Sequence, residues 1–132
     1  MDDWEELRDR GTKAKQHIVE LLGGLLSFTE AAALLSVNLP TLEHGKHTML
    51  AVPDTDGDWA FPRMQFTQSC RVRAGIAEVA KVGARIDPWV VLSVLVDDVP
   101  DGSAMLLEKL DDPAVLRDVL HRLDTYGEHV AS

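Results

Sequence analysis

Residues 27–45 read SFTEAAALLSVNLPTLEHG, and this stretch decides the fold. Ser27, followed three residues later by Glu30, has the form of a capping box. In that motif each of the two side chains bonds the backbone of the other at the start of a helix. We therefore expect a short helix that continues through residues 31–35.

A turn and a second helix are expected directly after it. Ser36-Val37-Asn38 interrupts the first helix, and Pro40 stands where the first residue of a new helix would. Gly45 is suited to end this second helix. Two short helices joined by a tight turn are typical of the helix–turn–helix, whose second helix enters the major groove of DNA while the first supports it.

Two short apolar runs follow the second helix. They occupy residues 49–52 and 59–61 and flank the turn-rich loop PDTDGD at residues 53–58. Extended runs on either side of a loop with glycine predict a β-hairpin. Such a hairpin would be the wing of a helix–turn–helix, with Arg63 placed to touch a phosphate. Residues 27–66 are thus predicted to form a short winged helix–turn–helix.

The segment before it, residues 1–26, is predicted to be a helix. Apolar or small residues recur at alternating steps of three and four, which places them on one helical face. They are Trp4, Leu7, Gly11, Ala14, Ile18, Leu21 and Leu25. This face can lie on the helix's own domain, or it can pair with a second copy, since the spacing also fits about three heptads. Gly23-Gly24 is a natural end for the helix.

Residues 67–132 predict a helical domain. Asp87-Pro88 and Asp112-Pro113 each combine an N-cap with a proline at the first helical position. Helices are therefore expected over residues 89–96 and from residue 114 to the end. Because residues 89–96 are rich in β-branched side chains, a buried strand is an alternative there.

Two further helices are expected in this half. Residues 72–83 carry an apolar stripe at helical spacing, and Ser103 can cap a short helix that runs through Leu110. The whole chain is therefore predicted to be mainly α, with a small β-hairpin in its first half and a helical domain after it.

The charge of the chain limits what it can bind. It carries 13 Lys and Arg against 22 Asp and Glu, for a net charge of -9. Because a protein that grips phosphates needs a basic face, this balance excludes the simplest nucleic-acid binder and disfavours anionic membranes. Within residues 27–66, two bases and five acids give a net of -3. Acidity thus favours a basic protein partner first and DNA second.

The sequence offers no set of residues for catalysis or for a metal. Cys70 is the single cysteine and has no assignable base, and His44 and His47 lack further ligands at a zinc spacing. Asp54 and Asp56 resemble a truncated calcium loop without its bidentate glutamate. We therefore expect no enzyme, no metal and no cofactor. The lone cysteine, with no signal peptide and no membrane span in the sequence, indicates a cytoplasmic protein.

The order of these motifs resembles a family of bacterial antitoxins. Residues 28–37, 50–52 and 59–66 look like its MerR-like helix–turn–helix and wing, which end in an aromatic-proline-x-x-glutamine-phenylalanine signature. The second half is similar to the Xre/MbcA/ParS toxin-binding domain. The segments that carry this similarity are Asp87-Pro88-Trp89, residues 92–95, the loop 100–103, residues 106–107 and Tyr126-Gly127-Glu128.

The resemblance implies a type II antitoxin that neutralises a cognate RES-domain toxin, an NAD-consuming enzyme, and regulates its operon by binding DNA. Carried over by position, the DNA-binding residues would be Asn38, Leu39, Thr41 and Lys46, with Arg63 on the wing. The toxin-binding residues would be Trp89, Asp98, Asp101, Ser103, Arg122, Tyr126, Glu128 and His129. The alternative is a DNA-binding transcriptional regulator without a toxin partner.

Overall fold

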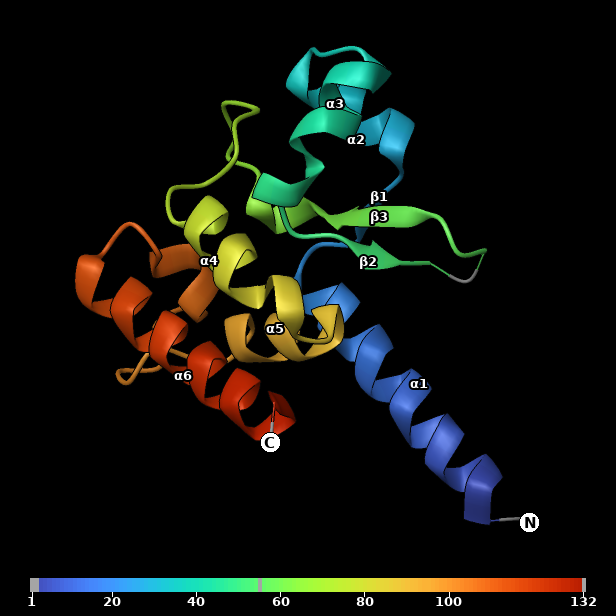
Figure 1. The fold of residues 1–132 in the computed structure, drawn as a ribbon, viewed down its shortest axis with the longest axis vertical. Helices are drawn as coiled ribbons and strands as arrows, with labels where there is room; N and C mark the ends of the chain where they lie inside the picture. Colours follow the sequence, from blue (N-terminus) through green and yellow to red (C-terminus); the bar gives the residue numbers. More distant parts are fainter. Residues whose placement is uncertain (1–2, 55, 132) are drawn as a thin grey trace.

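The computed structural model describes residues 3–54 and 56–131, and within them the side chains of residues 10–54 and 56–126. A small three-stranded sheet with two short helices forms one part of the molecule, and a group of helices that ends in the long α6 forms the other (Figure 1). The prediction of a mainly helical fold with a small hairpin is confirmed. No helix in the described part of the chain is long and apolar enough to cross a membrane.

The first half contains α1 and a winged helix–turn–helix. Its elements are α1 (Asp3–Leu21), β1 (Leu25–Leu26), α2 (Phe28–Leu35), α3 (Leu39–Gly45), β2 (Val52–Pro53) and β3 (Trp59–Pro62), with 3-10 turns η1 (Lys46–Thr48) and η2 (Arg63–Gln65). The predicted hairpin is β2–β3, with Val52 opposite Ala60. The sequence did not predict β1, which pairs antiparallel with the other edge of β3. Two residues are too short to carry a period-2 pattern.

The predicted capping box is present at the start of α2. The Glu30 N–H donates to the Ser27 hydroxyl at 3.1 Å, and the Ser27 N–H donates to the Glu30 carboxylate at 3.0 Å. Ser36 ends the helix in the left-handed conformation at φ 57°. Asn38 then starts α3 by accepting a hydrogen bond from the Thr41 N–H at 2.8 Å. These local bonds build the turn between α2 and α3.

The second half is a helical domain. Its elements are α4 (Ile76–Val82), α5 (Pro88–Leu95) and α6 (Pro113–Ala131), with 3-10 turns η3 (Gly83–Arg85) and η4 (Leu106–Lys109). Asp87 and Asp112 accept hydrogen bonds from the N–H groups two residues ahead, at 2.8 and 2.9 Å. Both aspartate–proline predictions are confirmed, and the strand alternative for residues 89–96 is wrong.

The structure corrects the prediction for Ser103. The short helix there is η4, whose N-cap is Met105 without a side-chain cap. The Ser103 hydroxyl instead donates to the Asp101 carboxylate at 2.6 Å, which closes a turn three residues before η4 begins. The helix predicted from the stripe at residues 72–83 is shorter than expected. It is α4, which begins only at Ile76, after Gly75 at φ 88°.

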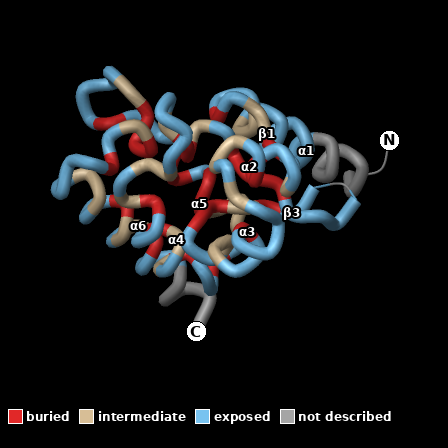
Figure 2. The backbone as a smooth tube through the Cα atoms, turned by 90° about the horizontal axis from the view of Figure 1, so that it is seen from above, coloured by how far each residue is buried: buried red, intermediate tan, exposed pale blue. Residues whose placement is uncertain are grey.

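Buried residues, red in Figure 2, occur in both halves, and the larger buried cluster has members from both. A small cluster that includes Ala31, Leu42 and Phe61 lies inside the winged helix. Leu50 and Val52 belong instead to the larger cluster of the helical domain. Because part of the hairpin packs into the second core, we expect the wing and the helical domain to unfold together.

The helix α1 packs on the rest of the molecule only near its end. Leu22, just after the helix, is fully buried, and Ile18 and Val19 are half-buried. Residues 10–17 are exposed without exception, which is more than two turns of the helix, although the Lys15 ammonium lies over the Trp89 ring of α5. In Figure 1 this helix projects away from the body of the molecule.

Candidate interaction surfaces

The second helix of the helix–turn–helix, α3, exposes the residues that the resemblance assigns to DNA. Leu42 anchors the helix and is 2% exposed, whereas Leu39 is 49% exposed. Asn38 and Thr41 are exposed beside Leu39 at the start of the helix. The structure therefore brings Asn38, Leu39 and Thr41 together on one solvent-facing end of α3.

Lys46 lies apart from that group, in η1 after α3. It is half-buried, and its ammonium lies 2.7 Å from the Glu43 carboxylate. An ammonium paired with a carboxylate has little net charge to offer a phosphate. Of the two bases in residues 27–66, Lys46 is thus neutralised within the fold.

Arg63, the other base, does not lie at the tip of the wing. β3 begins at Trp59 beside the wing loop and ends at Pro62, so Arg63 lies about 13 Å further along the strand direction. Its N–H donates to the Gly24 carbonyl at 3.0 Å, and Gly24 precedes β1. The sequence placed Arg63 on the wing, but the residue lies at the end of β3 that is remote from the wing loop. The pairing of β1 with β3 holds this end of the strand close to the end of α1.

The wing loop is acidic and tightly held. The Asp54 carboxylate accepts hydrogen bonds from the N–H groups of Asp56 and Asp58 at 2.9 and 3.0 Å. A groove beside this loop is lined by Asp54, Asp58 and Trp59, and on its other side by Glu43 and the start of α2. Three carboxylates therefore line the groove between the reading helix and the wing.

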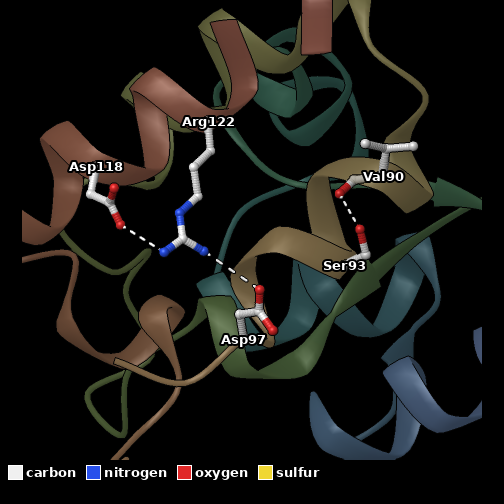
Figure 3. Close-up of polar contacts among 5 residues, drawn as sticks. All are labelled: Val90, Ser93, Asp97, Asp118 and Arg122. Carbon is white, nitrogen blue, oxygen red and sulfur yellow. Dashed lines mark hydrogen bonds and ion pairs between the residues drawn. The ribbon is translucent and has the colours of Figure 1, made fainter. Parts of the chain in front are cut away.

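A charged cluster joins the end of α5 to α6. Figure 3 shows Arg122 between two carboxylates, with Asp118 one turn earlier on α6 at 3.0 Å and Asp97 at 3.5 Å. The sequence analysis selected Arg122 but missed Asp97 and Asp118. The Asp118–Arg122 pair could have been found from its i, i+4 spacing, but the contact with Asp97 spans 25 residues and has no local signal.

The loop between α5 and η4 holds three further predicted residues. Asp98 bridges to Met105 across the loop, which brings its two ends together. Asp98, Asp101 and Ser103 are all exposed. Hydrogen bonds from the side chain and backbone of Ser103 keep the pKa of Asp101 below its usual value, so this loop presents anionic side chains.

The remaining predicted residues lie at different places. Tyr126 is 47% exposed and stands one turn beyond Arg122 on the same side of α6. Trp89 lies at the opposite end of α5, about 12 Å from Asp97. Its ring is covered by the Lys15 ammonium of α1, 5.3 Å from the ring centre. Glu128 and His129 belong to α6, but their side chains lie outside the described part of the chain.

No group of three or more His, Cys, Asp or Glu side chains suited to a metal ion occurs among the described residues. Cys70 is exposed, and its backbone is left-handed at φ 60°. The structure thus brings together two sets of predicted residues, the start of α3 and the Arg122 region, and leaves Lys46, Arg63 and Trp89 outside them.

Comparison with known proteins gives a structural match. No family model matches the chain, and no curated protein matches it. The fold is similar to the NMR structure of Rv2175c, with a TM-score of 0.60 at 18% sequence identity, over 78% of this chain and 80% of that one. A similarity at this identity extends to the fold, so the chain shares its overall fold with that protein.

Proposed function

We propose that this chain is an antitoxin-like regulator whose first ligand is a basic protein, a RES-type NAD-consuming toxin, and whose second is operator DNA. The observation that carries the proposal is the pair of carboxylates, Asp54 and Asp58, that line the groove between α3 and the wing, where Glu43 is already paired with Lys46. A phosphate backbone would be repelled from this groove, whereas a basic protein surface complements it. The motif resemblance supplies the identity of the partner.

The helical domain offers a second surface for the same partner. The Asp97–Arg122 pair connects the loop after α5 to α6, and Tyr126 lies one turn further along. Tyrosine and arginine are the residue types that most often dominate protein interfaces. Arg122 is held by two carboxylates, so less conformational entropy is lost when a partner binds it.

The test uses the product of the neighbouring reading frame as the toxin. We expect Tyr126→Ala and Asp98→Lys each to weaken the complex about tenfold or more, because an interface anchor contributes on the order of 2 kcal/mol. Rescue of growth and of cellular NAD during co-expression reports neutralisation, and calorimetry of the purified pair gives the Kd. Arg117→Ala, an exposed α6 residue five positions before Arg122, is the control. The proposal fails if the toxin does not bind, or if both variants bind like the wild type.

DNA binding alone is the second candidate function, and the exposed start of α3 favours it. Leu39, Thr41 and His44 face solvent on a helix that the left-handed Ser36 turn sets apart from α2. This is the arrangement in which a reading helix reaches base edges. With its bases neutralised or remote, the helix is expected to bind weakly, and with a shallow dependence on salt because few phosphates are neutralised.

Mobility shifts with the DNA upstream of the chain's own coding region test this candidate. We expect His44→Glu to weaken binding at least about tenfold at low salt, because it adds a carboxylate to the surface that faces the phosphates. His121→Glu makes the same change on an exposed face of α6 and should bind like the wild type. Equal affinities for the two variants would rule out α3 as the reading element.

We also infer that the protein is a homodimer joined through α1. The exposed turns at residues 10–17 belong to the face that carries Gly11, Ala14 and Ile18. An amphipathic helix gains most of its stability from packing its apolar face, so a projecting helix of this kind calls for a partner. A second copy would also double the few contacts that each winged helix can make with DNA.

A further inference from the structure

A cavity of about 280 Å³ lies between the segment that follows α3, the wing and the helical domain. Its lining comes from η1, residues 49–51 before β2, the start of β3, the end of α4, η3 and α5. Met49, Ile86 and Val91 are among the apolar walls, and Trp59, 43% exposed, lies at the outer side. Its charged or titratable lining side chains are Lys46 and His47.

We propose that this cavity binds a small carboxylic acid with an apolar body, such as an aromatic or short aliphatic acid. The apolar part would occupy the space between Met49, Ile86 and Val91. The carboxylate would accept hydrogen bonds from Lys46 and His47 at the rim. This site is separate from the charged cluster at Arg122 and from the exposed start of α3.

The walls of the cavity are held in place without a ligand. Gln65 is fully buried, and its side chain both accepts from the Leu50 N–H and donates to the Leu50 carbonyl, each at 2.7 Å. The amide of Gln65 thus fixes the segment at residues 49–51, which forms one wall. On the other wall, a Cβ at Gly83 would lie 2.9 Å from a Val91 methyl, so glycine there sets how closely η3 approaches α5. A preformed cavity loses less free energy to ordering when a ligand binds.

The size and lining of the cavity define the ligand class. Since a water molecule occupies about 30 Å³, the space holds roughly nine waters or a ligand of similar bulk, at the small end of ligand sites. No lining residue carries a carboxylate, and Glu43, beside the rim, is already paired with Lys46, so a cationic ligand would find no unpaired counter-charge. The pairing leaves Lys46 little net charge, but its ammonium has three N–H donors and can still hydrogen-bond the carboxylate of a ligand.

A ligand in this position would contact parts of both halves. Lys46 and His47 follow α3 without a break, Trp59 begins β3, and Val91 belongs to α5. If a bound molecule has a higher affinity for one relative position of α3 and the helical domain, it would therefore shift the population toward that position.

Titration of the full chain with benzoate and hexanoate, followed by NMR of the methyl groups, tests the proposal. We expect saturable shifts at Met49, Ile86 and Val91. Lys46→Met should weaken benzoate binding about tenfold and leave the uncharged analogue benzamide unchanged, because the lost contact is a hydrogen bond to a charged group.

A second pair of variants tests the location. Ala84 is an exposed residue of the cavity lining, and Ala84→Phe should fill the entrance and abolish the shifts. Ala77→Phe places the same ring on an exposed part of α4 outside the lining and should bind like the wild type. The site is overturned if neither acid causes saturable shifts up to about 10 mM, because even a Kd in the millimolar range would be detected at that concentration. Binding that survives Ala84→Phe overturns its location, and equal loss of benzoate and benzamide in Lys46→Met overturns the role of the carboxylate.

Discussion

At the scale of a single residue, Ser27 fixes the position at which α2, the first helix of the helix–turn–helix, begins. Its hydroxyl accepts the Glu30 N–H, which would otherwise lie unpaired at the start of α2. We expect Ser27→Ala to lower the free energy of unfolding by about 1 kcal/mol, measured by urea denaturation. Thr29→Ala removes a neighbouring exposed hydroxyl that makes no cap and should change stability by only a few tenths. Equal losses in the two variants would contradict a capping role for Ser27.

The same cap predicts a pH dependence. Hydrogen bonds from the backbone and side chain of Ser27, with the charge of Arg63 nearby, hold the pKa of Glu30 below its usual value of 4.5. A carboxyl whose folded-state pKa is lowered stabilises the fold above its unfolded pKa and loses that contribution as the pH falls through the folded value. Glu30→Gln should therefore be less stable than the wild type at pH 7, and the two should converge in acid. A difference that grows below pH 4 would refute this assignment.

At the scale of elements, alanine substitutions at two glycines are predicted to change the stability in opposite directions. A methyl group at Gly83 would lie 2.9 Å from Val91, so Gly83→Ala must push η3 away from α5 and should cost about 1–3 kcal/mol. Gly11 lies in α1 with no atom near its missing Cβ. Gly11→Ala should therefore stabilise α1 of a single chain by about 1 kcal/mol or less, through helix propensity, when measured at a protein concentration too low for pairing. Denaturation of both variants checks the opposite signs, and a neutral Gly83→Ala would mean that η3 can move away freely.

The elements also show what the sequence could and could not predict. Three helix starts could be predicted because a cap is made by residues that are neighbours in the chain. They are marked by Ser27 with Glu30, and by the prolines that follow Asp87 and Asp112. The strand β1 was missed because its pairing with β3 is between residues distant in sequence. For the same reason the sequence placed Arg63 on the wing and gave no sign that Asp97 would meet Arg122. Contacts of this kind depend on how elements pack, which a local pattern does not encode.

At the scale of the whole molecule, we expect the charges along α1 to set the orientation of the proposed dimer. In the sequence of this helix, residues 3–9 hold four acids and one base, a net of -3, whereas residues 10–17 hold three bases and no acid, a net of +3. Two copies side by side in parallel would place like charges together. An antiparallel pair lays each acidic half on the basic half of its partner.

We therefore expect a dimer that weakens with salt, because its orientation depends on exposed charges that 0.5 M NaCl would screen. Ala14→Glu puts a carboxylate on the stripe and should shift the sedimentation-equilibrium mass toward the monomer, whereas Gln16→Glu adds the same charge on the opposite side of α1 and should not. Circular dichroism of both variants separates loss of pairing from loss of the helix. The proposed pairing through α1 is contradicted if the wild-type chain stays monomeric at high protein concentration. It is also contradicted if Ala14→Glu leaves the dimer intact.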